Sequence, residues 1–246
     1  MEIRDIYLKY LSAELFDQGL GFPIHAETNA EPVVTDRFSL LERLCAGKRI
    51  LHLGCADHMA LIDKKMSNGT WVHGYLSKIS LKCLGIDINR ASIDYLQNRL
   101  GINNVMYADI TEEIPVSIKE SSPWDIVFLG EMIEHIDNPV HFLQSLGKGL
   151  RGCAKELVMT APNAISWQNY LNVRKGIECI NSDHRYWFTP YTLAKVAHEA
   201  SFKPTAFYFV TSYKLPKFRG IRSYLHHRRL QRFPGFRETI VLRAAF

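Results

Sequence analysis

Short apolar segments alternate with longer stretches of helical periodicity over most of the chain. Five of the apolar segments predict β-strands, at 48–54, 81–87, 103–109, 124–130 and 155–161. Each is followed by a stretch long enough for a crossover helix, most clearly 91–100 and 138–150. This order predicts a doubly wound, Rossmann-like α/β sheet, mostly parallel, with helices on both faces. A ligand is then expected beyond the carboxyl ends of the strands.

The last part of the chain follows a different order. A helix is expected over 191–202 and strands over 205–210 and 238–246, with no crossover helix between these strands. An antiparallel pair at one edge is therefore expected, which gives a seven-stranded sheet with an antiparallel last strand. Residues 1–35 are interpreted as an N-terminal helical extension. A single domain is expected over 36–246, where Asp36 caps the first helix.

Composition narrows the class of protein. The 246 residues are 47% hydrophobic, which is ample for one large core. No apolar run is long enough to span a bilayer, and the N-terminus lacks the features of a signal peptide, so a cytoplasmic protein is expected. The five cysteines are scattered and never form C-x-x-C, which argues against a disulfide framework or a zinc site.

The positive charge is local. The net charge is +5, but the segment 211–237 holds eight Lys or Arg and no acid, so the rest of the chain carries −3 (5 − 8). Aromatic residues are interleaved with these cations. We expect this segment to project near the ligand face and to favour an anionic partner: a nucleotide-linked sugar, a phosphorylated glycan or glycolipid, nucleic acid, or an acidic membrane surface. The alternative is a solvated loop of no particular function.

Three strand ends carry candidate ligand-binding residues. Gly54 ends the first predicted strand, where a glycine lets the backbone approach a ligand. Asp87 ends the second and can accept hydrogen bonds from ribose hydroxyls, and Asp109 ends the third and can meet an adenine amino group. A strand-end cap for Asp87 and an N-cap before Thr111 for Asp109 are the alternatives. A nicotinamide site is disfavoured, because G-x-G-x-x-G is absent and the gap of 33 residues from Gly54 to Asp87 exceeds the roughly 20 expected there.

Over most of 36–210 the chain resembles the class I S-adenosylmethionine-dependent methyltransferases. The matching segments are 51–58, 85–88, 108–110, 125–139 and 160–163. The runs 130–139 and 184–193 resemble a subgroup from polysaccharide and lipopolysaccharide gene clusters. The resemblance implies S-adenosylmethionine as cofactor, transfer to a hydroxyl of a sugar, glycan or glycan-linked molecule, and cofactor contacts from Gly54, Cys55, His58, Asp87, Ile88, Asp109, Ile110 and Gly130.

The glycine loop departs from the family pattern, because Gly54 is the one glycine that remains where two or three are common. His58 or His73 could help to hold the methionine end of the cofactor, and a structural role is the alternative for each. Methyl transfer to a hydroxyl needs alignment, exclusion of water and a base. His135 and His184 are the candidate bases. In the alternative, His135 is a packed histidine and His184 is a loop anchor bonded to Asp183.

A second interpretation concerns a metal. Glu131, Glu134, His135 and His184 resemble the divalent-metal ligands of small-RNA 3′-terminal 2′-O-methyltransferases, which would make the chain an RNA enzyme. In the metal-free alternative, Glu131 contacts the cofactor or acceptor and Glu134 makes a local ion pair. A third interpretation is a non-catalytic binding module that keeps the fold as a scaffold.

Overall fold

The computed structural model describes residues 11–12, 36–212 and 220–246. Apart from Leu11 and Ser12, the predicted N-terminal extension lies outside the described residues. Leu11 is buried in the main hydrophobic core. Within the described ranges, no helix has the length and apolar character that crossing a membrane requires.

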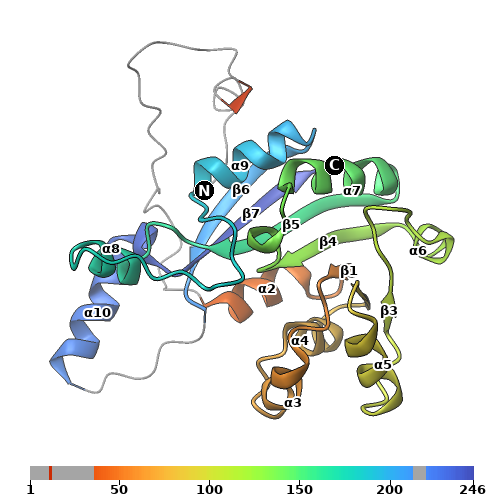
Figure 1. The fold of residues 1–246 in the computed structure, drawn as a ribbon, viewed down its shortest axis with the longest axis horizontal. Helices are drawn as coiled ribbons and strands as arrows, with labels where there is room; N and C mark the ends of the chain where they lie inside the picture. Colours follow the sequence, from red (N-terminus) through yellow and green to blue (C-terminus); the bar gives the residue numbers. More distant parts are fainter. Residues whose placement is uncertain (1–10, 13–35, 213–219) are drawn as a thin grey trace.

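A seven-stranded sheet forms the centre of the molecule (Figure 1). Its strand order is β3-β2-β1-β4-β5-β7-β6, and β7 runs antiparallel to both β5 and β6. The predicted fold class, including the antiparallel last strand, is confirmed. The strands are β1 (Arg49–Leu53), β2 (Lys82–Asp87), β3 (Val105–Tyr107), β4 (Trp124–Gly130), β5 (Ala154–Pro162), β6 (Lys203–Val210) and β7 (Thr239–Ala245).

Helices cover both faces of the sheet (Figure 1). Alternate residues of β1 point to opposite faces, so Leu51 and Leu53 pack in one core and Ile50 in another. One face carries α6 (Val116–Glu120), α7 (Pro139–Leu150) and α9 (Pro190–Glu199); the other carries α2 (Arg37–Cys45), α3 (Met59–Ser67), α4 (Val72–Ile79) and α5 (Arg90–Asn98). Asp36 accepts a hydrogen bond from the Ser39 amide, which confirms the predicted cap of the first helix.

The described part of the basic segment is largely helical, which the sequence analysis does not predict and which differs from its alternative of a solvated loop. Helix α10 (Ile221–Arg232) and the short 3-10 helix η2 (Pro234–Phe236) lie between β6 and β7. Helix α8 (Trp167–Val173) follows β5, and α8 and α10 lie together at one end of the sheet (Figure 1). The difference is tertiary in origin: α10 buries Leu230 and holds Arg229 against Trp167, which no local pattern reveals.

Candidate active site

The sheet has its topological switch point between β1 and β4. These strands are parallel neighbours, yet the order runs outward from β1 through β2 to β3 and from β4 through β5. In such sheets a ligand binds in the crevice beyond the carboxyl ends of the two central strands. Gly54 and Glu131 are the first residues after β1 and β4, and both have positive φ, +73° and +51°. A positive φ is ordinary for glycine but uncommon for a residue such as Glu131, and such conformations concentrate at functional sites.

The glycine loop is tied to the end of β2. Gly54 donates its amide to the Ile86 carbonyl over 2.9 Å, and Ala56 donates to the Asp87 carboxylate over 3.0 Å. The φ at Gly54 favours glycine, and a Cβ there would lie 3.1 Å from the Met132 sulfur, so that side chain would have to shift by a few tenths of an ångström. Cys55 is buried, and burial raises the pKa of its thiol well above the usual value. The loop therefore has a fixed shape despite its single glycine.

The two predicted acids lie at the ends of β2 and β3. The Asp87 carboxylate also accepts from the Asn89 amide over 2.9 Å, so it is oriented by backbone donors from both sides. Ile88 follows with 64% of its surface exposed, an apolar side chain open beside the acid. Asp109 accepts hydrogen bonds from both the amide and the hydroxyl of Thr111 within a turn. The alternative of an N-cap is wrong, because the next helix, α6, begins at Val116. Ile110, in contrast, is buried.

The two histidines considered for the methionine end lie in different environments. His73 is fully buried on α4, with its Nδ1 3.3 Å from the Nδ1 of His52, and burial lowers its pKa to about 4. This arrangement supports the structural alternative for His73. His58 is exposed, and its Nε2 lies 4.0 Å from an Asp183 carboxylate oxygen. His58 therefore reaches from the glycine loop towards the segment that carries His184.

Glu131 is engaged in an ion pair that the sequence did not suggest. Its carboxylate lies 3.1 Å from the Arg37 guanidinium and accepts from the Thr239 hydroxyl over 3.2 Å. Its amide donates to both the carbonyl and the hydroxyl of Thr160. Arg37 is nearly buried, so the pair links helix α2 to the residue after β4. These contacts favour a structural function of Glu131 over the predicted contact with the cofactor or acceptor.

Glu134, His135 and His184 come together beside the crevice. Glu134 and His135 belong to the 3-10 helix η1 (Ile133–His135), as the predicted turn requires. The His184 Nε2 lies 4.0 Å from a Glu134 oxygen, and the two imidazole rings meet edge to face with centroids 4.7 Å apart. Backbone contacts hold the segments together: the Arg185 amide donates to the Glu134 carbonyl, and His135 Nδ1 lies 3.1 Å from the Asp183 carbonyl.

The Glu134 carboxyl group is the least compensated polar group of this cluster. It is fully buried, and neither of its oxygens has a hydrogen-bond partner among the described residues. Burial raises its pKa to about 8. One ligand atom from each of Glu134, His135 and His184 lies within 4.8 Å of the others. Two imidazoles and a carboxylate are a donor set that suits a divalent cation, so these three residues fit the metal of the alternative interpretation, while Glu131 is paired with Arg37.

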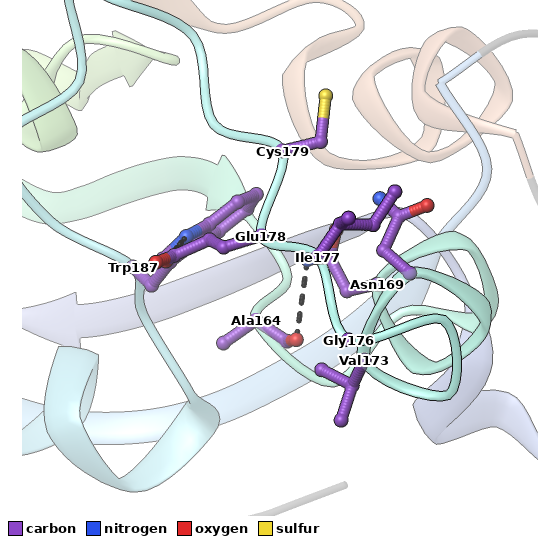
Figure 2. A pocket seen from close by; sticks show the side chains of 9 residues that line it. Ala164, Asn169, Val173, Gly176, Ile177, Glu178, Cys179 and Trp187 are labelled. Atoms are coloured by element: carbon purple, nitrogen blue, oxygen red, sulfur yellow. Dashed lines mark hydrogen bonds between the residues drawn. The ribbon is translucent and has the colours of Figure 1, made fainter.

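A pocket of about 420 Å³ lies between α8 and the segment that leads to His184 (Figure 2). Trp187 and Glu178 form one side, where the indole N–H donates to the carboxylate over 3.0 Å. Asn169 and Ile177 form the other side. The Trp187 and His184 rings have centroids 6.5 Å apart, so the pocket adjoins the histidine pair. The sequence predicted a helix after β5 but gave no sign that it would line a pocket.

Comparison with solved structures identifies the fold. No family model matches the chain, and no curated protein matches it. An S-adenosylmethionine-dependent methyltransferase from Aquifex aeolicus is 16% identical with a TM-score of 0.52, over 86% of this chain and 90% of that one. One from Thermotoga maritima is 13% identical, with a TM-score of 0.53 over 87% and 89%. The chain therefore has the fold of the class I S-adenosylmethionine-dependent methyltransferases.

Proposed function

We propose that the protein is an S-adenosylmethionine-dependent methyltransferase that acts on a hydroxyl group of a sugar, glycan or glycan-linked molecule. One observation supports the methyltransferase activity: the amides of Ala56 and Asn89 hold the Asp87 carboxylate at the switch point of this fold. A carboxylate fixed there can accept hydrogen bonds from both ribose hydroxyls of a nucleoside. The bound cofactor supplies a methyl group on a sulfonium, which needs no covalent activation by the protein.

The remaining cofactor contacts follow from the order of the strand ends. Ile88 offers an exposed apolar surface for the adenine ring, and Asp109 offers a carboxylate for its amino group. The turn at Gly54 and the amides at the start of α3, which no side chain caps, suit the methionine carboxylate. In this account Cys55, Ile110 and Gly130 shape the walls, and His58 lies at the rim.

His184 is the better supported of the two candidate bases. Its Nε2 lies 4.0 Å from the Glu134 carboxylate in the turn after β4, and its ring lies 6.5 Å from that of Trp187 in the pocket beside α8. Burial, and then the nearby His135, lower the pKa of His184, so its imidazole is uncharged at neutral pH and able to accept a proton. In the pocket, the Trp187 ring suits the apolar face of a sugar, and Glu178 and Asn169 offer hydrogen bonds for its hydroxyls. This combination supports a sugar acceptor.

A metal-assisted RNA 2′-O-methyltransferase is the second candidate. The buried, uncompensated Glu134 carboxyl group favours it, because a carboxylate there is costly unless a cation accompanies it. Glu134, His135 and His184 would hold the ion, which would favour the ionised form of Glu134 and lower the pKa of a nearby acceptor hydroxyl. The presence of Asp87 and Asp109 at the strand ends argues against the third candidate, a scaffold without activity.

Transfer of a tritiated methyl group from S-adenosylmethionine to two acceptor panels tests these proposals. One panel holds nucleotide-linked sugars and oligosaccharides, and the other holds short RNAs. Labelling of sugars that persists in chelator and is lost in His184→Ala supports the leading proposal. RNA labelling that requires manganese supports the second. Calorimetric binding of manganese to wild type but not to Glu134→Gln tests the ion site independently of activity.

A further inference from the structure

Helix α10 presents an unusual stripe to solvent. Ile221, Leu225, Arg228 and Arg232 follow one another at spacings of four, three and four residues, which places them on one face of the helix. All four are exposed, and Ile221 and Leu225 expose 75% and 52% of their surface. Two aliphatic side chains and two guanidinium groups therefore share the outward face of the helix.

The opposite face of α10 fixes the helix to the domain. Leu230 is buried, and its carbonyl accepts a hydrogen bond from the Arg237 Nε over 3.1 Å. The same guanidinium donates to the Phe209 carbonyl at the end of β6 over 2.9 Å. The Arg229 guanidinium lies 3.7 Å from the ring centre of Trp167 on α8. The outward stripe is therefore held in place before any partner binds, which lowers the entropic cost of binding.

The charge along the stripe is mostly positive, although Arg237 is buried and the exposed Glu238 directly follows the segment. Residues 220–237 contain five arginines and no aspartate or glutamate. Phe233, which directly follows the helix, is 49% exposed and lies beneath the Arg232 guanidinium at 5.5 Å. A surface of this kind attracts anions and at the same time offers apolar side chains that water solvates poorly.

We propose that this face of α10 docks on the surface of an anionic lipid bilayer, with Ile221, Leu225 and Phe233 entering the interface and the arginines facing the headgroups. A basic, amphipathic helix that lies flat in the interface binds through these two contributions together. Nucleic acid would use the arginines and the ring of Phe233, but it would leave Ile221 and Leu225, which offer no ring for stacking on bases, in contact with water. The observations therefore favour a lipid surface, and the proposal is independent of the reaction catalysed.

Flotation of the full-length protein with lipid vesicles tests the proposal. We expect binding to phosphatidylcholine vesicles that contain about 30% phosphatidylglycerol, weaker binding at high salt, and little binding to phosphatidylcholine alone. The double variant Ile221→Ser/Leu225→Ser should lower the partition coefficient about tenfold or more. Arg228→Gln/Arg232→Gln should lower it about thirtyfold at low salt, since each cation near the surface contributes about a factor of five.

A matched control removes two exposed lysines from another part of the domain. Lys64→Gln/Lys78→Gln makes the same change in net charge and should bind as wild type does, apart from a small uniform electrostatic loss. Circular dichroism establishes that each variant is folded. Equal binding of the control and the α10 variants would overturn the proposal. So would binding of an RNA oligonucleotide by wild type together with failure to float with anionic vesicles.

Discussion

The Glu131 carboxylate lies 3.1 Å from the Arg37 guanidinium, so the residue that follows β4 is anchored to helix α2. The Arg37 side chain is 9% exposed and that of Glu131 is 34% exposed. Loss of Arg37 leaves the carboxylate with Thr239 as its hydrogen-bonding partner at a backbone position of positive φ. We expect Arg37→Gln to lower the free energy of unfolding by about 2 kcal/mol, less than for a fully buried pair because Glu131 is partly solvated.

Urea denaturation followed by circular dichroism measures this effect. Glu131→Gln is the matched variant, because its amide oxygen can still accept from both Arg37 and Thr239. We expect it to lose about half as much stability. Equal stability of Arg37→Gln and wild type would show that the pair is not a structural anchor, and it would restore Glu131 as a candidate for direct contact with ligand.

The buried histidine of α4 makes folding depend on pH. The pKa of His73 is about 4 in the folded protein and 6.5 in the unfolded chain. A depressed folded pKa means that the stabilising contribution is complete above pH 6.5 and is lost as the pH falls towards 4, with a total of about 3 kcal/mol. The free energy of unfolding of His73→Phe, relative to that of wild type, should therefore rise by about 1.4 kcal/mol when the pH is lowered from 7.5 to 5.5. Urea titrations at the two pH values give the difference directly, and parallel curves for the two proteins would refute the assignment.

Glu134 should show the opposite dependence on pH. Its pKa rises from 4.5 in the unfolded chain to about 8 in the folded protein. Its contribution to stability is therefore complete below pH 4.5 and is lost as the pH rises to 8. With a chelator present, the free energy of unfolding of Glu134→Gln, relative to that of wild type, should rise by up to about 4 kcal/mol when the pH is raised from 4.5 to 8.5. Thermal unfolding of both proteins across this pH range checks the direction of the effect. A relative stability of Glu134→Gln that rises as the pH falls would contradict the burial of an uncompensated carboxyl group.

Two glycines of similar backbone conformation test whether the turn at Gly54 belongs to the cofactor site. Gly54 and Gly69 both have positive φ, but a Cβ meets the Met132 sulfur at 3.1 Å in one case and open space in the other. Both alanine variants should lose about 1 kcal/mol of stability through backbone strain. Binding of S-adenosylhomocysteine should weaken in Gly54→Ala and stay unchanged in Gly69→Ala. Calorimetric titration with S-adenosylhomocysteine measures both affinities. An affinity of Gly54→Ala equal to that of wild type would show that the turn is not part of the binding site.

Much of the fold could be predicted because the sequence patterns are local. The five parallel strands have apolar runs that end in polar or glycine residues, and Asp36 caps its helix as an N-cap aspartate should. Helix α10 could not be predicted in this way, since its few apolar residues do not form one continuous buried stripe. Its position depends on Arg237 and Trp167, which lie outside the helix.

The candidate site was predictable at strand ends and less so elsewhere. Asp87 and Gly54 lie where the order of strands requires. The gathering of His184 with Glu134 joins residues 50 positions apart, and their similarity to a known ligand pattern was the one sequence signal for it. The Arg37 pair had no signal, because nothing local distinguishes a buried arginine from an exposed one at the first turn of a helix.

The central claim is that Asp87 organises a site for S-adenosylmethionine, and calorimetric titration with S-adenosylhomocysteine tests it most directly. We expect micromolar binding by wild type, with a loss of about tenfold to a hundredfold in Asp87→Ala, the range expected when hydrogen bonds to a charged group are removed. Asp94→Ala, an exposed acid on α5, should bind as wild type does. Absence of binding by folded wild type, or equal affinity in Asp87→Ala, would contradict the account.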